Sequence, residues 1–461
     1  GLTPAGLPED LCYKLNQYYE QKLRQDKTAH DKIEFEIIFN TYDFMTDTRL
    51  KELAEYGFDD VEISQLRNAL FEIAKQTLEH YDEICEEDLR SLGQLTELRH
   101  ELRKHSPLAE TNVMKLYSYI DELLDSIKDH GTPQFTRQAR CAFMARSFCR
   151  TLVEKGYFTK QEMDDFMLSI PTVASEFERD FDLYSHGKLS RDDFNHLYGH
   201  LRLGTYDIRS DSYRNIYFDV ASANLTGNNK VKQEAKSLDL ERLQVALDEA
   251  GIPVTPEKFI EFIKKATQNR EYFKFEFTKS LSLMLDVIVK LGEVMAIARE
   301  DMSYLEIQDL LSYHSRDSYI QTIETRRRFY HVNSYLVLPE VIFDVGDIDV
   351  IDIDEARPNF ITNKVVEAPI VNLDEDHDSD ITGKIVVLTK ADPGYDWIFA
   401  KDIAGFVTKY GGAASHMAIR CAEFGIPAAI GCGEKIYQRI HRMQIMCLDC
   451  ENGRITEKQS Q

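Results

Sequence analysis

Residues 411–431 read GGAASHMAIRCAEFGIPAAIG, and the C-terminal part of the chain is organised around this run. Gly411 and Gly412 follow a predicted strand, where their missing side chains permit a tight turn and the close approach of another molecule. Ser415 and His416 then begin a predicted helix, whose free backbone N–H groups and positive dipole end favour a bound anion. The run therefore predicts a strand, a glycine turn and a helix that begins beside a histidine.

The histidine in this run has a chemistry that suits its position. A neutral imidazole near neutral pH is a good nucleophile toward phosphorus. At a helix N-terminus beside glycines, His416 is suited to hold a phosphoryl group and to pass it on. A histidine near a helix start is also often a simple cap or surface residue, so residue types alone leave both readings open.

The residues around this run predict a small α/β unit with short connections. The acidic tract 374–380 reads as a solvated loop. Alternating or continuous apolar runs predict strands at 341–354, 364–373, 383–389, 405–410, 427–431 and 444–450, and helical spacing predicts helices at 396–403 and 415–424.

The first two thirds of the chain have a helical texture instead. Apolar residues recur at helical spacing from about residue 60 to 170, and Gly156 is a plausible C-cap in that region. One exception is IEFEIIFNTY at 33–42, whose alternation and β-branched residues predict a strand. Further helices are expected at 234–250, at 255–298 and, as a pair, at 303–331.

Composition limits the classes of partner. The chain has 461 residues, with 55 Lys plus Arg against 79 Asp plus Glu, a net charge of −24. Such an acidic surface repels phosphate backbones and anionic lipid, so neither nucleic acid nor a membrane is expected as a partner. No apolar run has the length of a membrane span and no signal peptide is evident, so a cytoplasmic location is expected.

The eight cysteines of the sequence fit the same location. They are scattered along the chain and read as reduced thiols. Cys447 and Cys450 form one C-x-x-C pair, but no second pair stands at zinc-site spacing, so no metal ligands are identified.

The 411–431 run as a whole resembles the swivelling phosphohistidine domain of the phosphoenolpyruvate synthase and pyruvate phosphate dikinase family. The resemblance implies that His416 is the covalent nucleophile and that Gly411, Gly412 and Ser415 cradle its phosphate. Arg420, one turn further along the helix, could neutralise the phosphate or could be a solvated arginine. Ala414 departs from the family, whose members usually have threonine there. The positions that match are Gly411, Gly412, Ser415, His416, Ala418, Ala422, Gly425, Pro427 and Gly431.

Two strings in the helical part resemble branches of the same superfamily that are fused to a helical acceptor domain. In YGHLRLGTYDI (198–208), Arg202 could stabilise transferring charge and His200 or Asp207 could take a proton. Thr205 and Tyr206 add polar groups to this loop, which could equally be a structural corner. In GTPQFTRQARCAFMARS (131–147), Arg137 and Arg140 share one helix face that either grips an anion or is simply solvated.

The resemblance also implies cofactors. Family members carry an ATP-grasp domain that uses ATP and Mg²⁺ to phosphorylate the histidine, releasing AMP and phosphate. No glycine-rich ATP loop with its lysine is found in this sequence, so that domain is expected before Gly1. The phosphoenolpyruvate-binding barrel is likewise not found, which implies an acceptor other than pyruvate, bound by the helical domain.

Three interpretations of the function are open, two of which differ in the acceptor. The chain is most similar in texture to the L-glutamine kinases of capsular phosphoramidate synthesis, which implies the side-chain amide of L-glutamine. A rifampicin phosphotransferase-like activity would instead need a large apolar pocket. A phosphocarrier module without its own chemistry is the third possibility, although it would need little beyond residues 360–461.

The expected fold class is therefore multidomain α + α/β, with a large, mostly helical domain followed by a small swivelling β/β/α phosphohistidine domain. The expected divisions are an N-terminal segment with a strand at 1–60, remnant of or linker from an ATP-grasp domain, a helical acceptor domain at 61–335, a strand-rich linker at 336–360 and the phosphohistidine domain at 361–461.

Overall fold

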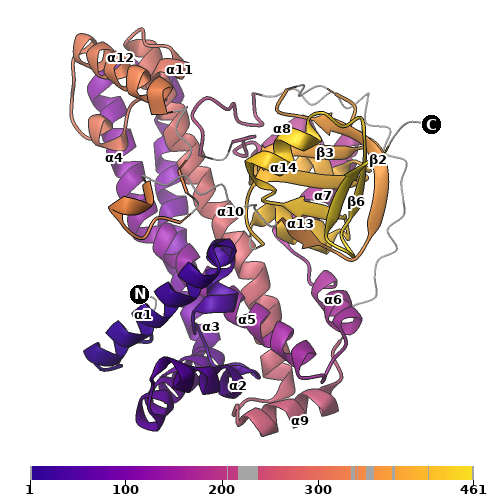
Figure 1. Ribbon diagram of the computed structural model, residues 1–461. Coiled ribbons are helices and arrows are strands. Elements are labelled where there is room, and N and C mark those ends of the chain that lie inside the picture. Colours follow the sequence, from indigo (N-terminus) through magenta and orange to yellow (C-terminus); the bar gives the residue numbers. More distant parts are fainter. Residues whose placement is uncertain are drawn as a thin grey trace.

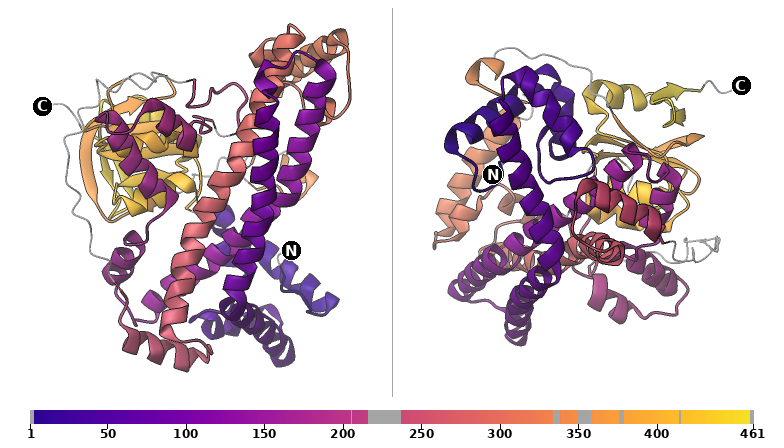
Figure 2. Two further views of the ribbon diagram at one scale, coloured as in Figure 1. Left: turned by 180° about the vertical axis from the view of Figure 1, so that it is seen from behind. Right: turned by 90° about the horizontal axis from the view of Figure 1, so that it is seen from below.

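Helices dominate the first two thirds of the protein, and a mixed sheet follows (Figure 1). The computed structural model describes residues 3–204, 206–215, 237–333, 338–339, 341–348, 358–375, 379–413 and 415–458. A helical domain and a sheet domain lie side by side, with the sheet domain against α10 (Figures 1 and 2).

Three long helices, α3 (Asp60–Lys104), α5 (Thr132–Glu154) and α10 (Pro256–Val294), form the frame of the helical domain. α3 begins with a capping box, in which the Asp59 side chain accepts from the backbone of Glu62 while the Glu62 side chain accepts from Asp59. The predicted helices between 60 and 170 are confirmed. The other helices in this domain are α1 (Glu9–Gln25), α2 (Thr46–Leu50), α4 (Val113–His130), α6 (Lys160–Leu168), α7 (Val173–Ser185), α8 (Arg191–Tyr198), α9 (Leu240–Ala250), α11 (Arg299–Met302) and α12 (Arg316–Asn333), with short 3-10 helices at Lys27–Lys32, Lys51–Tyr56, Pro107–Ala109 and Ile307–Leu310.

The strand predicted at 33–42 is wrong. Residues Ile33–Ile37 form a π-helical turn, and the backbone becomes extended only at Ile38. The apolar side chains of this segment pack into the helical core, where Ile37, Ile38 and Phe39 are buried. The N-terminal segment shares one apolar cluster with α3, α5 and α10, so the boundary expected near residue 60 does not separate two cores.

The linker before the sheet also differs from the expectation. Val345–Ile348 form a 3-10 helix within the stretch 341–354 that was predicted to be strand, and residues 349–357 lie outside the described residues. No hydrogen-bonded neighbour strand stands beside 341–348 in the described part of the chain, so its alternating pattern has no sheet to join.

The sheet domain has seven strands in the order β1-β5-β4-β3-β2-β6-β7. Strands β2 to β5 run parallel, whereas β1, β6 and β7 pair antiparallel at the two edges. The predicted strands from 364 onward are confirmed, while β1, β7 and α14 are additions. The elements are β1 (Asn359–Ile361), β2 (Val365–Asn372), β3 (Ile385–Lys390), the 3-10 helix η8 (Pro393–Ala400), β4 (Gly405–Tyr410), α13 (His416–Glu423), β5 (Ala428–Ile430), α14 (Gly433–Ile440), β6 (Ile445–Asp449) and β7 (Arg454–Glu457).

The two domains meet through α7, α8 and η8. In both figures α7 and α8 lie against the sheet domain (Figures 1 and 2). Aromatic side chains of α7 and α8, among them Phe177 and Phe194, form a cluster against which Trp397 and Ala400 of η8 pack. Tyr213, from the loop after α8, also donates a hydrogen bond to the carbonyl of Gly394 at 2.7 Å. The sheet domain is thus docked on the helical domain.

Candidate functional site

His416 lies where the glycine turn leads into α13. Gly411 has φ +136°, and a Cβ there would stand 2.8 Å from the Cβ of Ala391, so the turn requires glycine. Ser415 is the N-cap, and its hydroxyl accepts a hydrogen bond from the backbone N–H of Ala418 at 3.3 Å. The strand, the glycine turn and the helix predicted from the sequence are confirmed, and they present His416 at the first position of α13.

Two carboxylates hold the imidazole of His416. Its Nε2 lies 2.7 and 2.9 Å from the two carboxylate oxygens of Asp396, which comes from η8 of the same domain. Its Nδ1 lies 3.3 Å from Oε2 of Glu271, which comes from α10 of the helical domain. The side chain is 9% exposed, and a residue of the other domain is one of its two ionic partners. His416 therefore lies at the junction between the domains.

These carboxylates determine the charge of His416. Burial alone lowers the pKa of the imidazole, but Asp396 and Glu271 together raise it above its ordinary value. Conversely, burial raises and His416 lowers the pKa of Glu271, and the net shift is downward. The pKa of Asp396 is also lowered, against the effect of burial, by His416 and Arg420. His416 thus lies buried between two carboxylates that favour its protonated form.

Arg420 lies in the same site but does not face solvent. Its side chain is almost fully buried, with Nη1 bonded to Glu423 at 2.8 Å and Nε 3.5 Å from Asp396. Its Nη2 donates to the carbonyl of Ala174 in α7 at 3.3 Å, and its guanidinium lies 4.2 Å from the ring centre of Phe424. Of the two readings given above, the solvated arginine is wrong. Arg420 positions Asp396 and links the domains.

Further charges on α10 lie close to His416. Arg270 and Lys274 flank Glu271 in sequence, and both contribute to the lowering of the Glu271 pKa. Burial lowers the pKa of Lys274, and the carboxylates of Glu271 and Asp396 oppose that shift. The sequence interpretation did not single out Glu271, Arg270 or Lys274. Charged residues recur along α10, so no local signal in the sequence marked these three.

The 198–208 loop has a different role from the one expected. Arg202 is 1% exposed, and its guanidinium is bonded to the hydroxyl and carbonyl of Ser282, the carbonyl of Ser210 and the carboxylate of Asp286. Because every nitrogen of this guanidinium has an acceptor within the chain, Arg202 anchors the loop to α10. The expectation that it stabilises transferring charge finds no support in this geometry.

The other members of that loop are spread over its surface and interior. Tyr206 is 60% exposed, and Asp207 pairs with Arg209 at 2.7 Å. His200 is buried, with its ring edge-on to Phe275 of α10 at 4.7 Å between ring centres. Thr205 lies outside the described residues. His200 thus packs on α10 one turn after Glu271, while Arg202 is bonded further along the same helix, at Ser282 and Asp286.

Arg137 and Arg140 are not brought to His416. Arg137 pairs with the buried carboxylate of Asp88 on α3 at 3.1 Å, while the side chain of Arg140 is exposed. Across the described residues no hydrogen bond or ion pair joins either arginine to the site. The solvated or ion-paired reading of this pair therefore fits the geometry.

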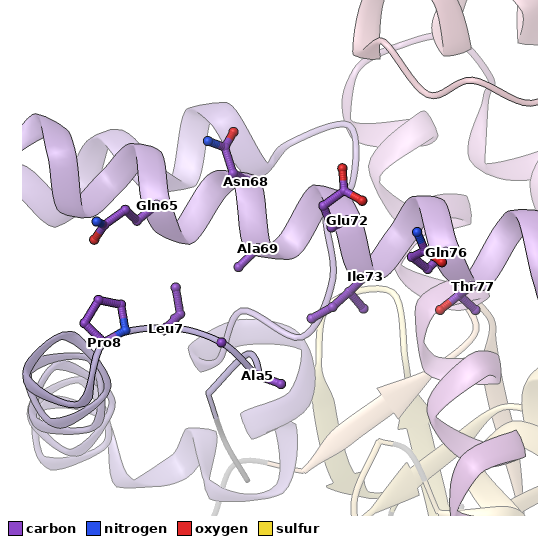
Figure 3. A pocket seen from close by; sticks show the side chains of 11 residues that line it. Ala5, Leu7, Pro8, Gln65, Asn68, Ala69, Glu72, Ile73, Gln76 and Thr77 are labelled. Carbon is purple, nitrogen blue, oxygen red and sulfur yellow. The ribbon is translucent and has the colours of Figure 1, made fainter.

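The two cavities described in the protein lie away from His416. One, of about 760 Å³, is a groove between the N-terminal segment and α3, lined by Leu7, Pro8 and Ile73 among others (Figure 3). The other, of about 440 Å³, lies between the loop at Asp211–Asn215 and the C-terminal half of α10. Neither has His416, Asp396 or Glu271 in its lining.

Within the described residues no group of three or more His, Cys, Asp or Glu side chains is placed to hold a metal ion. No helix in the described part of this chain combines the length and apolarity needed to cross a membrane.

Comparison with known proteins places the site in a family context. Residues 381–453 match the family described as PEP-utilising enzyme, mobile domain. The rifampicin phosphotransferase of Bacillus subtilis (strain 168) is 28% identical over 222 residues, 44% of this chain and 24% of that protein. The rifampicin phosphotransferase of Bacillus cereus (strain ATCC 14579) is 26% identical over 212 residues, 42% of this chain and 24% of that protein.

This chain thus spans about a quarter of the length of the curated relatives that it matches. The matches support the resemblance to the PEP-utilising family that the 411–431 run indicated. They give no support to the L-glutamine kinase branch in particular.

Proposed function

We propose that His416 carries a phosphoryl group and transfers it to a small molecule bound against α10 of the helical domain. The observation that carries this proposal is the contact of His416 with Glu271, because it brings the matched mobile domain onto the charged face of α10. The relatives named as phosphotransferases support the same class of reaction. Under this proposal the chain is the carrier and acceptor part of an ATP-dependent phosphotransferase.

The first step takes place away from the docked arrangement. A neutral ring nitrogen attacks the β-phosphorus of ATP, so that an N–P bond forms, the P–O bond to AMP breaks and AMP leaves. Water then cleaves the P–O bond between the β- and γ-phosphorus, which releases phosphate and leaves one phosphoryl group on the ring. Both ring nitrogens of the docked His416 face carboxylates that favour the protonated ring, which has no free electron pair for this attack. The sheet domain must therefore leave Glu271 before His416 is phosphorylated. Mg²⁺ would accompany ATP in that step.

The second step uses groups of the docked site. Glu271 accepts the proton of the acceptor, whose oxygen or nitrogen attacks phosphorus while the N–P bond breaks and its electron pair returns to the imidazole. Arg270 and Lys274 stabilise the negative charge that develops on the transferring group. The proton then passes from Glu271 to His416, which completes the proton balance of the transfer. The described pose, with its imidazolium, corresponds to the state after transfer.

Two classes of acceptor each have support. The charged residues around Glu271 favour a small polar acceptor, of which L-glutamine, through its side-chain amide, is the first candidate. The names of the curated relatives favour an alcohol such as rifampicin.

The experiment incubates the full-length protein with ATP labelled at the β-phosphate. We expect acid-labile, base-stable label on His416, none in His416→Ala, and normal labelling in the control His196→Ala on α8. Adding the acceptor should discharge the label, and AMP release should rise with L-glutamine. Turnover by His416→Ala would refute the proposal. A phosphohistidine that no amino acid or alcohol discharges would instead identify a phosphocarrier without its own acceptor.

A further inference from the structure

His200 has a buried nitrogen for which the protein supplies no partner. The side chain is 8% exposed, and its Nε2 is fully buried without a hydrogen-bond partner among the described residues. A buried polar atom that lacks a partner costs free energy, so its retention points to a group that arrives from outside the chain. The ring packs against Phe275, one helical turn after Glu271 on α10.

Four cations surround this histidine. Lys279 also lies over the Phe275 ring, with its Nζ 4.5 Å from the ring centre. Arg99 of α3 is fixed to α10 by hydrogen bonds to Ser280 and to Glu276. Arg103 lies one turn after Arg99 on α3, and the backbone N–H of Arg214 donates to the carbonyl of Gly199, the residue before His200. These residues, His200, Arg99, Arg103, Arg214 and Lys279, are called the basic cluster below.

The basic cluster carries excess positive charge in an acidic protein. Its carboxylate partner is Glu276, which pairs with Arg99 at 3.1 Å and with Lys279 at 2.5 Å. No ion pair to Arg103 or Arg214 is found in the described residues, and both side chains are exposed. Arg103 and Arg214 thus add positive charge at the surface near His200, within a chain whose net charge is −24. An anion bound there would gain favourable electrostatic interactions with these guanidinium groups.

The surroundings of His200 favour a neutral imidazole that can donate one hydrogen bond. Burial, followed by the charges of Lys279, Arg99, Arg214 and Arg103, lowers the pKa of His200 well below its ordinary value. A neutral imidazole can still donate one N–H to an anionic oxygen. The cluster thus combines a neutral donor in the interior with cations at its rim.

We propose that the basic cluster binds the carboxylate of the acceptor and so restricts the acceptor to small carboxylic acids. This proposal rests on the proposed function for the identity of its ligand. Phe275, against which His200 packs, lies four residues after Glu271 on α10, about 6 Å along the helix axis, and Lys279 lies eight residues after it, about 12 Å along the axis. An amino acid with a short side chain can place its reacting atom at Glu271 and direct its carboxylate toward His200.

The first test uses inorganic phosphate as the probe and needs no turnover. The ring ¹⁵N signals of His200, assigned by His200→Gln, are followed during a phosphate titration at constant ionic strength. We expect a saturable shift in the native chain and in His416→Ala. The double variant Arg103→Gln/Arg214→Gln should weaken binding by about tenfold or more, because charge-assisted hydrogen bonds are lost. The matched control Arg90→Gln/Arg328→Gln removes two exposed cations elsewhere and should bind as the native chain does.

The second test compares L-glutamine with L-glutaminol, which lacks the carboxylate. In the native full-length protein we expect L-glutamine to have the lower KM, and Arg103→Gln/Arg214→Gln to raise that KM by about tenfold with kcat nearly unchanged. Label on His416 without turnover of L-glutamine would show that L-glutamine is not the acceptor. The phosphate titration would then still test whether the basic cluster binds an anion. A shift that does not saturate, or one that is equal in the double variant and the native chain, would overturn the cluster as an anion site.

Discussion

His416 is held as a cation by two residues from opposite sides of the domain junction. Replacing Glu271 by Gln or Asp396 by Asn removes one of the groups that raise its pKa, so we predict that the pKa of His416 falls in both variants. The measurement is an NMR titration of the histidine ring signals. His441, which pairs with Glu375 at the surface, serves as the internal control and should titrate unchanged. An unchanged His416 pKa would show that the pairs do not persist in solution.

A second prediction compares two glycines of the sheet domain, Gly431 beside the turn before His416 and Gly453 away from it. Gly431 has φ +74°, and a Cβ there would stand 2.3 Å from the carbonyl oxygen of Gly411. We expect Gly431→Ala to lower the free energy of unfolding by at least about 2 kcal/mol, because strain and a backbone clash add together. Gly453 also has positive φ, but its nearest contact is Phe360 at 3.5 Å, so Gly453→Ala should cost about 1 kcal/mol. Urea denaturation of the two variants distinguishes these values.

For single residues, the sequence predicted the local features of the site and missed the contacts between residues that lie far apart in the chain. The glycine turn, the Ser415 cap and the position of His416 all follow from neighbouring residues. Glu271 and Asp396 come to His416 from 145 and 20 positions away, which no local pattern encodes. The partners of Arg202, Ser282 and Asp286, likewise lie on a helix far away in the sequence, so these contacts could not be predicted from a local pattern.

Among the elements, the loop after α8 is attached to α10 through the guanidinium of Arg202. Arg202→Ala would leave the carboxylate of Asp286 and several acceptors without their partner, so we predict a loss of about 3 kcal/mol or more in the free energy of unfolding. Arg209→Ala in the same loop breaks the half-exposed pair with Asp207 and should cost less than about 1 kcal/mol. Equal losses in the two variants would contradict the anchoring role.

The predictions of elements succeeded where pattern and tertiary surroundings agreed. Strands β3 and β4 are continuous apolar runs buried in a parallel sheet, and their pattern permits little else. The segment 33–42 has an equally strong strand pattern but no neighbour strand, so its apolar side chains joined a helical core instead. The presence of neighbouring strands, rather than strand propensity, decides which of these segments forms a strand.

For the whole molecule, docking of the two domains should depend on pH. The pKa of His416 is raised, so its ion pairs contribute fully below the ordinary histidine value of about 6.5 and are lost as the pH rises through the raised pKa. The pKa values of Asp396 and Glu271 are lowered, so their contribution is present above about 4.5 and fades as the pH falls further. We predict tightest docking between these limits, measured as the smallest radius of gyration by small-angle X-ray scattering. The variant His416→Gln should lack the alkaline opening.

One residue of the junction gives this protein a natural optical signal. Trp397 is the single tryptophan of the sequence, and it packs between the core of the sheet domain and the aromatic side chains of α7 and α8. Under the proposed function the sheet domain leaves Glu271 before His416 is phosphorylated, and this undocking should expose the indole and move its emission to longer wavelength. Stopped-flow fluorescence of the unlabelled chain could then time each excursion of the mobile domain within a single turnover.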